Sequence, residues 1–281
     1  MQIIAADMGR NESKFCTTNN QKAKFRSAVG EWHQRNLSSG GEWDVMIDGE
    51  NYFIGDLAFK EAYLPREMAT ESKIHEETKL LFLTGVALLA RDTDIVISTG
   101  LPINQFNPKG RDDIVNLLQG RHSVTFRDSK TKTFFINQIT VCPESGGVYW
   151  DEVNRKPQLK QGKIRVADIG SRTINYCTID DNNYINKDSD TLNYGAIKLK
   201  NSKTNPQEFA RKIVADLSSR WMEYDENNDT ILLSGGGAIL LENLLRPHFK
   251  NMMISEDPVY ANVIGFYNLG VMKYGKLMTA K

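Results

Sequence analysis

DMGRN at residues 7–11 and DIGSR at residues 168–172 are two similar turns, and each follows a run of mainly β-branched and small residues. Each run has the composition of a strand buried in a parallel sheet. The glycine lets the backbone turn tightly, so that main-chain N–H groups can face an anion. The aspartate puts a carboxylate beside this anion, which is favourable when a divalent cation lies between the two. One Asp-x-Gly turn is common, but two copies after buried strands predict a pair of β-hairpins that hold a nucleotide polyphosphate from both sides.

A third segment, SGGG at residues 234–237, lies between a predicted strand (230–233) and a predicted helix (239–245). Its glycines allow a flat or charged ligand to approach the bare backbone, and the helix N-terminus behind them favours anions. The chain has neither the Gly-Lys-Ser/Thr of a Walker loop nor Gly-x-Gly-x-x-Gly followed by a ribose-binding acid. Structural turns also use glycines, so the segment is weak evidence alone. Together with the two hairpins it predicts the third wall of one nucleotide cleft.

The composition excludes several classes of protein. The 281-residue chain has 35 basic and 35 acidic residues, so it has no net charge with which to attract DNA or an anionic membrane. Any association with DNA is therefore expected to use an adaptor. No basic segment or signal-like core precedes the first strand, and no apolar run approaches the roughly 20 residues that span a bilayer. Cys16, Cys142 and Cys177 lack metal-binding spacing, which favours reduced thiols in a cytoplasmic protein without direct membrane contact.

Periodicity and turn residues divide the chain into two α/β halves. In the first half we expect a small β-rich subdomain at about 22–72, a core helix at 73–91, and a buried strand at 94–98 that ends in TGLP (99–102). The other expected elements are a helix at 108–119, strands near 121–127 and 132–142, a polar stretch at 180–204, a helix at 206–224 and a final helix at roughly 258–275.

A linker rich in Lys, Gln and Pro at 154–162 is the expected domain boundary. Lobe I is then expected to contain residues 1–158 together with a C-terminal helix at about 263–281. Lobe II is expected to contain residues 159–262.

The order of these parts resembles the actin/Hsp70/sugar-kinase superfamily over nearly the whole chain. Its members have two ribonuclease-H-like halves, phosphate-binding hairpins and an adenosine-binding Gly-Gly-Gly segment. TGLP (99–102), Pro143-Glu144 and the pattern Pro258-x-x-Ala261-Asn262-x-x-Gly265 are most similar to the plasmid-segregating bacterial actins of the ParM and AlfA group. The chain between Asp168 and Gly235 is too short for an elaborate extra subdomain. The resemblance therefore implies an actin-like α/β fold with a reduced second lobe, nearest to AlfA-type filaments.

The resemblance also implies roles for individual residues. Asp7 and Asp168 are expected to orient Mg²⁺ through water, since Mg²⁺ dehydrates reluctantly, and with Glu144 they form the expected catalytic set. Glu144 is expected to position or activate the attacking water. The residues expected to bind nucleotide are Gly9, Asn11, Lys14, Gly170, Ser171, Thr173, Gly235, Gly236 and Gly237.

Several structural alternatives to these roles stay open. The two aspartates are also good turn formers, Lys14 is also compatible with a solvated edge lysine, and Glu144 follows a proline as many helix N-terminal residues do. Ser171 and Arg172 replace glycines that the superfamily usually has here. Arg172 either reaches a phosphate or covers a strand edge.

The function implied by the resemblance is a Mg²⁺-dependent ATPase (or GTPase) that polymerises with itself in the cytoplasm. Its filaments are expected to segregate low-copy plasmid DNA through a DNA-binding adaptor protein bound to a centromere-like site. Two alternatives are a small-molecule kinase of the same superfamily and a scaffold that binds nucleotide without hydrolysing it.

Overall fold

The computed structural model divides into two compact units, each described here by itself. The first unit contains residues 1–101, 107–141 and 269–281, and the second contains residues 102–106 and 142–268. The structure describes residues 1–17, 21–37, 41, 43–68, 72–127, 131–200, 203–221 and 223–278. None of the helices among these residues has the length and the apolar composition that spanning a lipid bilayer requires.

The first unit is built around one mixed sheet, with the strand order β3-β2-β1-β8-β10-β9-β5-β6-β4-β7 over the described residues. The strands are β1 (Gln2–Met8), β2 (Glu12–Thr17), β3 (Lys22–Arg26), β4 (Ala28–Glu31), β5 (Asp44–Ile47), β6 (Glu50–Ile54), β7 (Arg66–Glu67), β8 (Asp94–Leu101), β9 (Gly120–Phe126) and β10 (Lys132–Pro143). The helices are α1 (Asp56–Glu61), α2 (Glu76–Leu89) and α3 (Pro108–Leu118).

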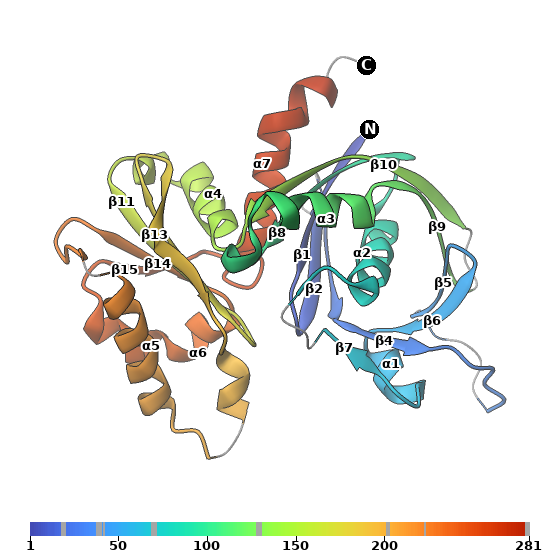
Figure 1. Ribbon diagram of the computed structural model, residues 1–281, viewed down its shortest axis with the longest axis horizontal. Helices are drawn as coiled ribbons and strands as arrows, with labels where there is room; N and C mark the ends of the chain where they lie inside the picture. The colour runs from blue at the N-terminus through green and yellow to red at the C-terminus, as the bar shows by residue number, and fades with distance from the viewer. Residues whose placement is uncertain are drawn as a thin grey trace. The chain divides into compact units, whose positions relative to one another are not determined.

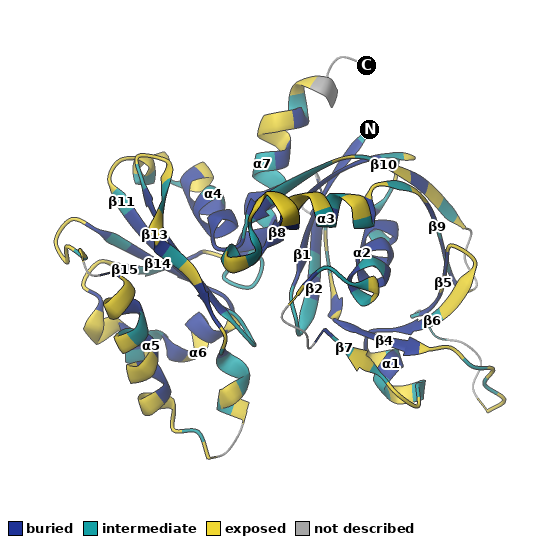
Figure 2. Cartoon of the chain, viewed as in Figure 1, coloured by how far each residue is buried: buried dark blue, intermediate teal, exposed yellow. Residues whose placement is uncertain are grey.

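Strands β1 and β8 are neighbours in the interior of this sheet and run parallel, with β2 antiparallel on the other side of β1. Every residue of β1 is buried (Figure 2). Helix α2 packs on β1 and β2 (Figure 1), and its N-cap residue is His75, whose side chain accepts from the Thr78 N–H. A Cβ on Gly85 of α2 would lie 2.1 Å from the Phe15 ring of β2, so the helix approaches the strand closely at this glycine. The core helix expected at 73–91 is confirmed.

The β-rich region expected at about 22–72 contains β3 to β7 and α1. It is continuous with the large sheet, because β5 pairs with β9. Pairing of β4 with both β6 and β7 extends the sheet further. Helix α1 was not expected from the sequence, since its six residues are too few for a 3.6-residue period to be visible.

The second unit contains a sheet with the strand order β13-β12-β11-β14-β15. The strands are β11 (Lys163–Ile169), β12 (Ile174–Asp180), β13 (Asn183–Leu192), β14 (Thr230–Ser234) and β15 (Met252–Ile254). The helices are α4 (Gly146–Arg155), α5 (Pro206–Arg220), α6 (Gly236–Leu245) and α7 (Ala261–Met278), with short 3-10 helices η1 (Ile103–Gln105), η2 (Pro157–Lys160), η3 (Ala196–Lys200) and η4 (Arg246–His248). Helix α7 continues into the first unit from residue 269.

Both faces of this sheet are covered, which explains why β11 has buried apolar residues on both sides. Ala167 and Ile169 lie in one core cluster with residues of α5 and α6. Ile164 and Val166 lie in a second cluster, with Val148 and other residues of α4. The alternation along β11 thus places successive side chains in different cores.

Two segments of the second unit differ in detail from the expectation. The polar stretch 180–204 contains β13, an edge strand with several exposed residues, so polar composition concealed its pairing with β12. The expected linker 154–162 contains the end of α4 and all of η2, and it lies within the second unit.

Candidate nucleotide-binding site

The first hairpin, formed by β1 and β2, places Asp7 opposite Lys14. The Lys14 Nζ lies 3.9 Å from Asp7 Oδ2, and the two side chains are only 15% and 11% exposed. Strand β2 also pairs with β3 on its other side. Lys14 is therefore not a solvated lysine on a sheet edge, and it places a cation beside the Asp7 carboxylate.

Ser27 stabilises the turn of the first hairpin by hydrogen bonds to its main-chain carbonyl groups. The Ser27 hydroxyl donates to the Gly9 carbonyl (2.6 Å), and the Ser27 N–H donates to the Asn11 carbonyl (3.0 Å). A Cβ on Gly9 would lie 2.4 Å from the Glu12 carbonyl oxygen, so the turn needs glycine at this position. Close backbone packing therefore determines that residue 9 is a glycine.

The TGLP segment supports the same hairpin. Its first three residues continue β8, which lies parallel to β1. The Thr99 hydroxyl is buried and donates to the Ala6 carbonyl, one residue before Asp7, over 2.8 Å. This contact fixes the end of β1.

The second hairpin, formed by β11 and β12, places Asp168 opposite Asn175 and beside Ser234 of β14. The Asn262 side-chain amide donates to Asp168 Oδ2 over 2.7 Å. Asp168 thus lies at the end of the central strand of its sheet, and its carboxylate accepts a hydrogen bond from the first turn of α7.

The turn that follows Asp168 is held by backbone hydrogen bonds. The Gly170 N–H donates to the Thr173 carbonyl (3.0 Å), which closes the turn. The N–H groups of Ala196 and Ile197 donate to the carbonyls of Gly170 (2.9 Å) and Ser171 (2.8 Å). As in the first hairpin, another segment engages two carbonyls of the turn.

The glycine segment packs directly on the end of β11. Gly235 has a φ of +83°, and a Cβ there would lie 2.4 Å from the Ile169 carbonyl oxygen and 2.6 Å from Asp168 Oδ1. A Cβ on Gly237 would lie 2.3 Å from the Ile169 side chain, whereas a Cβ on Gly236 would meet nothing within 4 Å. Two of the three glycines are therefore required by packing beside Asp168, and the middle one faces open space.

Glu144 is 4% exposed and follows the last residue of β10. The Asn175 side-chain amide donates to Glu144 Oε2 over 2.7 Å, and the Thr191 hydroxyl donates to Asn175 Oδ1 over 2.7 Å. Helix α4 begins two residues later, with Ser145 at its N-cap and no side-chain capping bond there. The Glu144 carboxylate is therefore bound by the second hairpin, because Asn175 is the residue opposite Asp168.

The Asn262 side chain links Asp168 to the backbone of Ser145, the residue that follows Glu144. Its side-chain oxygen accepts from the Ser145 N–H over 3.0 Å, while its amide nitrogen donates to Asp168. Sequence reasoning assigned no role to Asn262, although the pattern Pro258-x-x-Ala261-Asn262-x-x-Gly265 marked the segment. Nothing local in the sequence marked Asn175 as the partner of Glu144.

The cysteines show no sign of nucleophilic chemistry. Cys16, Cys142 and Cys177 are all buried, and none of the three forms a disulfide bond within the described part of the chain. Burial raises the pKa of the Cys177 thiol to about 12, although a hydrogen bond with Ser145 opposes this shift. Because thiolate is the reactive form, Cys177 stays an unreactive thiol near neutral pH.

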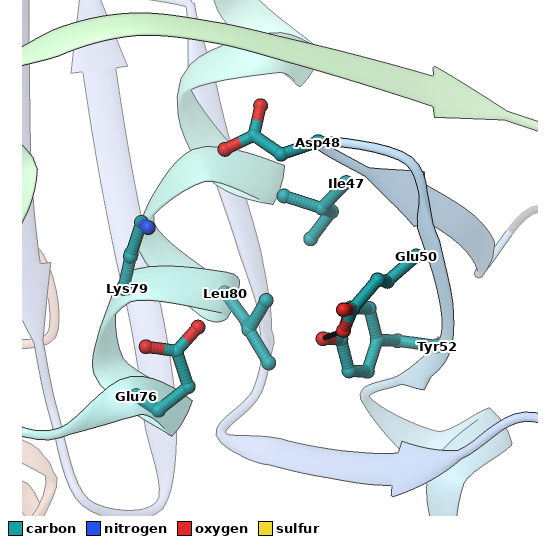
Figure 3. A pocket seen from close by; sticks show the side chains of 7 residues that line it. All are labelled: Ile47, Asp48, Glu50, Tyr52, Glu76, Lys79 and Leu80. Atoms are coloured by element: carbon teal, nitrogen blue, oxygen red, sulfur yellow. Dashed lines mark hydrogen bonds between the residues drawn. The ribbon is translucent and has the colours of Figure 1, made fainter.

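A hollow of about 180 Å³ lies elsewhere in the first unit (Figure 3). Its lining contains none of the residues expected from the sequence to bind nucleotide; it consists of Ile47, Asp48, Glu50, Tyr52, Glu76, Lys79 and Leu80. The Tyr52 hydroxyl donates to Glu50 Oε2 over 2.6 Å. Burial is the larger cause, and this hydrogen bond the second, of a rise in the Tyr52 pKa to about 12. Among the described residues, no group of three or more His, Cys, Asp or Glu side chains could hold a metal ion.

Comparison with known proteins gives a family and a fold. Residues 5–147, more than half of the chain, match the family model described as the N-terminal domain of actin-like proteins. A sequence comparison with curated proteins gives no match.

Solved structures are similar over almost the whole chain. A 15-stranded ParM filament from Clostridium botulinum has a TM-score of 0.81 and 22% identity, with 96% of this chain and 99% of that chain covered. An archaeal actin homologue in complex with ADP has a TM-score of 0.80 and 17% identity, with 97% and 100% covered. An AlfA filament bound to AMPPNP has a TM-score of 0.74 and 16% identity, with 99% and 98% covered.

Proposed function

The chain belongs to the family of actin-like proteins and has their fold, and from this premise we propose that it is a nucleotide-hydrolysing filament protein that segregates plasmid DNA. The observation that carries the proposal is the repeated geometry of the two hairpins. In each, an aspartate is the second-last residue of an interior strand, and another segment engages two carbonyls of the turn that follows. The expected actin-like fold with two sheets is confirmed by the family match and by the similar structures.

The proposed ligand of the hairpins is a magnesium-bound nucleoside triphosphate. One carboxylate on each hairpin, Asp7 and Asp168, fits an ion that keeps most of its water and takes few direct protein ligands. Bound Mg²⁺ supplies charge neutralisation of the phosphate oxygens. Lys14 adds a positive charge beside Asp7 for the terminal phosphates, and Asn11 adds a side-chain amide from the turn.

The backbone is proposed to do the rest of the binding. Tight turns at Gly9 and Gly170 present main-chain groups to phosphate, with Ser171 and Thr173 adjoining. The segment Gly235–Gly237 is proposed to flank the adenosine. Support comes from Gly236, where no atom lies within 4 Å of an added Cβ.

Glu144 is proposed as the group that orients the attacking water and accepts its proton. A carboxylate used in this way needs one fixed orientation, and the 2.7 Å hydrogen bond from Asn175 supports that. Little covalent chemistry is required of the protein, because phosphoryl transfer depends mainly on positioning and on charge stabilisation.

Self-assembly is proposed because similar solved structures are filaments of ParM and AlfA. Binding of ATP would favour the assembled state and hydrolysis would weaken it, as a shift between two populations. Equal numbers of basic and acidic residues support a DNA-binding adaptor in place of direct DNA contact. Buried cysteines that are not in disulfide bonds support a cytoplasmic location, where thiols stay reduced.

Sedimentation with Mg-ATP, Mg-ADP and no nucleotide tests the proposal, together with phosphate release and electron microscopy of the pellet. The expected result is filaments and phosphate release with Mg-ATP only. A protein that stays monomeric at high concentration with Mg-ATP overturns assembly. Filaments without phosphate release identify a non-hydrolysing scaffold, and phosphate transfer to a small molecule without filaments identifies a kinase.

A further inference from the structure

We infer that Asn262 is a positioning residue that couples the Asp168 carboxylate to the turn that carries Glu144. This inference rests on the proposed function and deepens it. It adds a residue that links Asp168, proposed to orient Mg²⁺, with Glu144, proposed to orient the attacking water. The segment 258–265, marked by its sequence pattern, has no part in the function as proposed above.

The two hydrogen bonds of Asn262 carry the inference. Its amide nitrogen donates to Asp168 Oδ2 (2.7 Å), and its oxygen accepts from the Ser145 N–H (3.0 Å). The residue is 5% exposed, so water competes weakly for these contacts. An amide satisfies both partners with one group. An aspartate keeps the acceptor for Ser145 but sets a second negative charge against Asp168, and an alanine removes both contacts.

The turn that Asn262 holds has an unusual backbone. Ser145 has a φ of +65°, a left-handed conformation that is unfavourable for a residue other than glycine. Such conformations persist where the surrounding structure determines them, and they gather at functional sites. The Ser145 N–H is the group that Asn262 binds, and Glu144 is the preceding residue. Loss of the hydrogen bond therefore acts directly on the backbone that orients Glu144.

Close helix packing makes this coupling rigid. A Cβ on Gly265 of α7 would lie 1.7 Å from the Gly147 carbonyl oxygen of α4, and a Cβ on Gly147 would lie 2.5 Å from the Asn262 carbonyl oxygen. The first turns of the two helices are therefore in backbone contact. This packing places the backbone of Asn262 directly beside the first turn of α4.

The same segment also reaches the glycine turn. The Pro258 carbonyl accepts from the Gly235 N–H (2.9 Å) and from the Ser234 hydroxyl (2.9 Å). Residues 258–265 thus contact the glycine turn, Asp168 and the Glu144 turn within one unit. The asparagine and the glycine of the pattern are thus explained by the Asp168 contact and by the close approach of α7 to α4.

The test compares Asn262→Asp and Asn262→Ala with Asn268→Ala as the control. Asn268 lies on the same helix, and its amide nitrogen has no hydrogen-bond partner among the described residues. Three quantities are measured: kcat and KM for ATP, the Mg²⁺ concentration at which the gain in nucleotide affinity from Mg²⁺ is half-maximal, and the midpoint temperature of thermal unfolding.

For both Asn262 variants we expect kcat to fall by about 10- to 100-fold, the size usual for residues that orient metal ligands. The half-maximal Mg²⁺ concentration should rise for Asn262→Ala, because Asp168 loses the hydrogen bond that orients it. KM for ATP at saturating Mg²⁺ should change much less than kcat, and Asn268→Ala should behave as wild type. At saturating Mg²⁺ in a Glu144→Gln background, Asn262→Ala should slow turnover by less than it does in the wild type, because the part of its effect that acts through the Glu144 carboxylate is already lost.

Two outcomes overturn the inference while leaving the proposed function intact: wild-type kcat and Mg²⁺ dependence in both Asn262 variants, or losses fully accounted for by a lowered folded fraction. Failure of the proposed function is different, because the wild-type protein itself then neither binds nor hydrolyses Mg-ATP. If the wild-type protein binds Mg-ATP without turnover, the Mg²⁺ dependence of affinity still decides whether Asn262 acts on Asp168.

Discussion

The two hairpins have the same sequence signature, but their aspartates have different neighbours. Asp7 lies 3.9 Å from the Lys14 ammonium, whereas Asp168 accepts a 2.7 Å hydrogen bond from the neutral Asn262 amide. The first turn is held by one serine, and the second by backbone N–H groups. Under the proposed function, the first hairpin supplies charge for phosphate, and the second holds the groups that position the attacking water. A repeated motif thus has two different chemical settings.

The largest effect is expected at Glu144, on the side of the second hairpin. Glu144→Gln keeps the shape and an acceptor for Asn175 but removes the base, so kcat should fall by about 10²- to 10⁴-fold while nucleotide affinity is kept. Phosphate release and nucleotide titration measure the two quantities. Glu12→Gln on the first hairpin is the control, since Glu12 pairs with Lys24 (3.1 Å) and should not affect turnover. Wild-type turnover in Glu144→Gln would assign this residue a structural role.

The next effect separates the two charges of the first hairpin. Asp7→Ala should weaken nucleotide binding by about 10- to 100-fold in the presence of Mg²⁺, which corresponds to about 1.5–3 kcal/mol for contacts with charged groups. Without Mg²⁺ the same change should have little effect or should strengthen binding, because it removes a negative charge. Lys14→Met should weaken binding with or without Mg²⁺. Wild-type affinity of Asp7→Ala with Mg²⁺ would exclude Asp7 from the site.

A third effect concerns Cys177, on the second strand of the second hairpin. Its pKa is raised by burial from 9.0 to about 12 in the folded protein, so above pH 9 the unfolded chain loses a proton that the folded chain keeps. The free energy of unfolding should therefore fall as pH rises, by up to about 1.4 kcal/mol per pH unit from this thiol. Denaturant unfolding between pH 8 and pH 11 measures the slope. Cys177→Ala should have a shallower slope, and an equal slope would contradict the assignment.

The smallest effect is expected at Ser27. Ser27→Ala removes a buried hydroxyl that donates to the Gly9 carbonyl, but Gly9 itself is partly exposed, so water can replace the lost donor there. The free energy of unfolding should fall by about 0.5–1.5 kcal/mol. Nucleotide affinity should fall modestly, because the turn loses a constraint. A loss of turnover as large as that of Glu144→Gln would remove the functional distinction between the hairpins.

Local sequence patterns predicted the strands and the helix that position the candidate site. The apolar pattern or the length of a segment marked four elements in the sequence. They are the strands before the two aspartates (β1 and β11), the core helix at 73–91 (α2) and the strand before Ser234 (β14). The open position of Gly236 and the positive φ of Gly235 agree with an expected glycine turn. Strands β13 and β15 escaped notice, because one is polar and at an edge and the other has three residues.

The sequence by itself determined the two hairpin turns, the glycine turn and the family, because each depends on residues that are neighbours in the chain. Only the tertiary structure decided that Asn262 binds Asp168, 94 residues away, and that Asn175 binds Glu144, 31 residues away. An asparagine has the same local preferences whether or not it meets a carboxylate. Its role is therefore created by strand register and helix packing, which bring distant polar groups within hydrogen-bond distance.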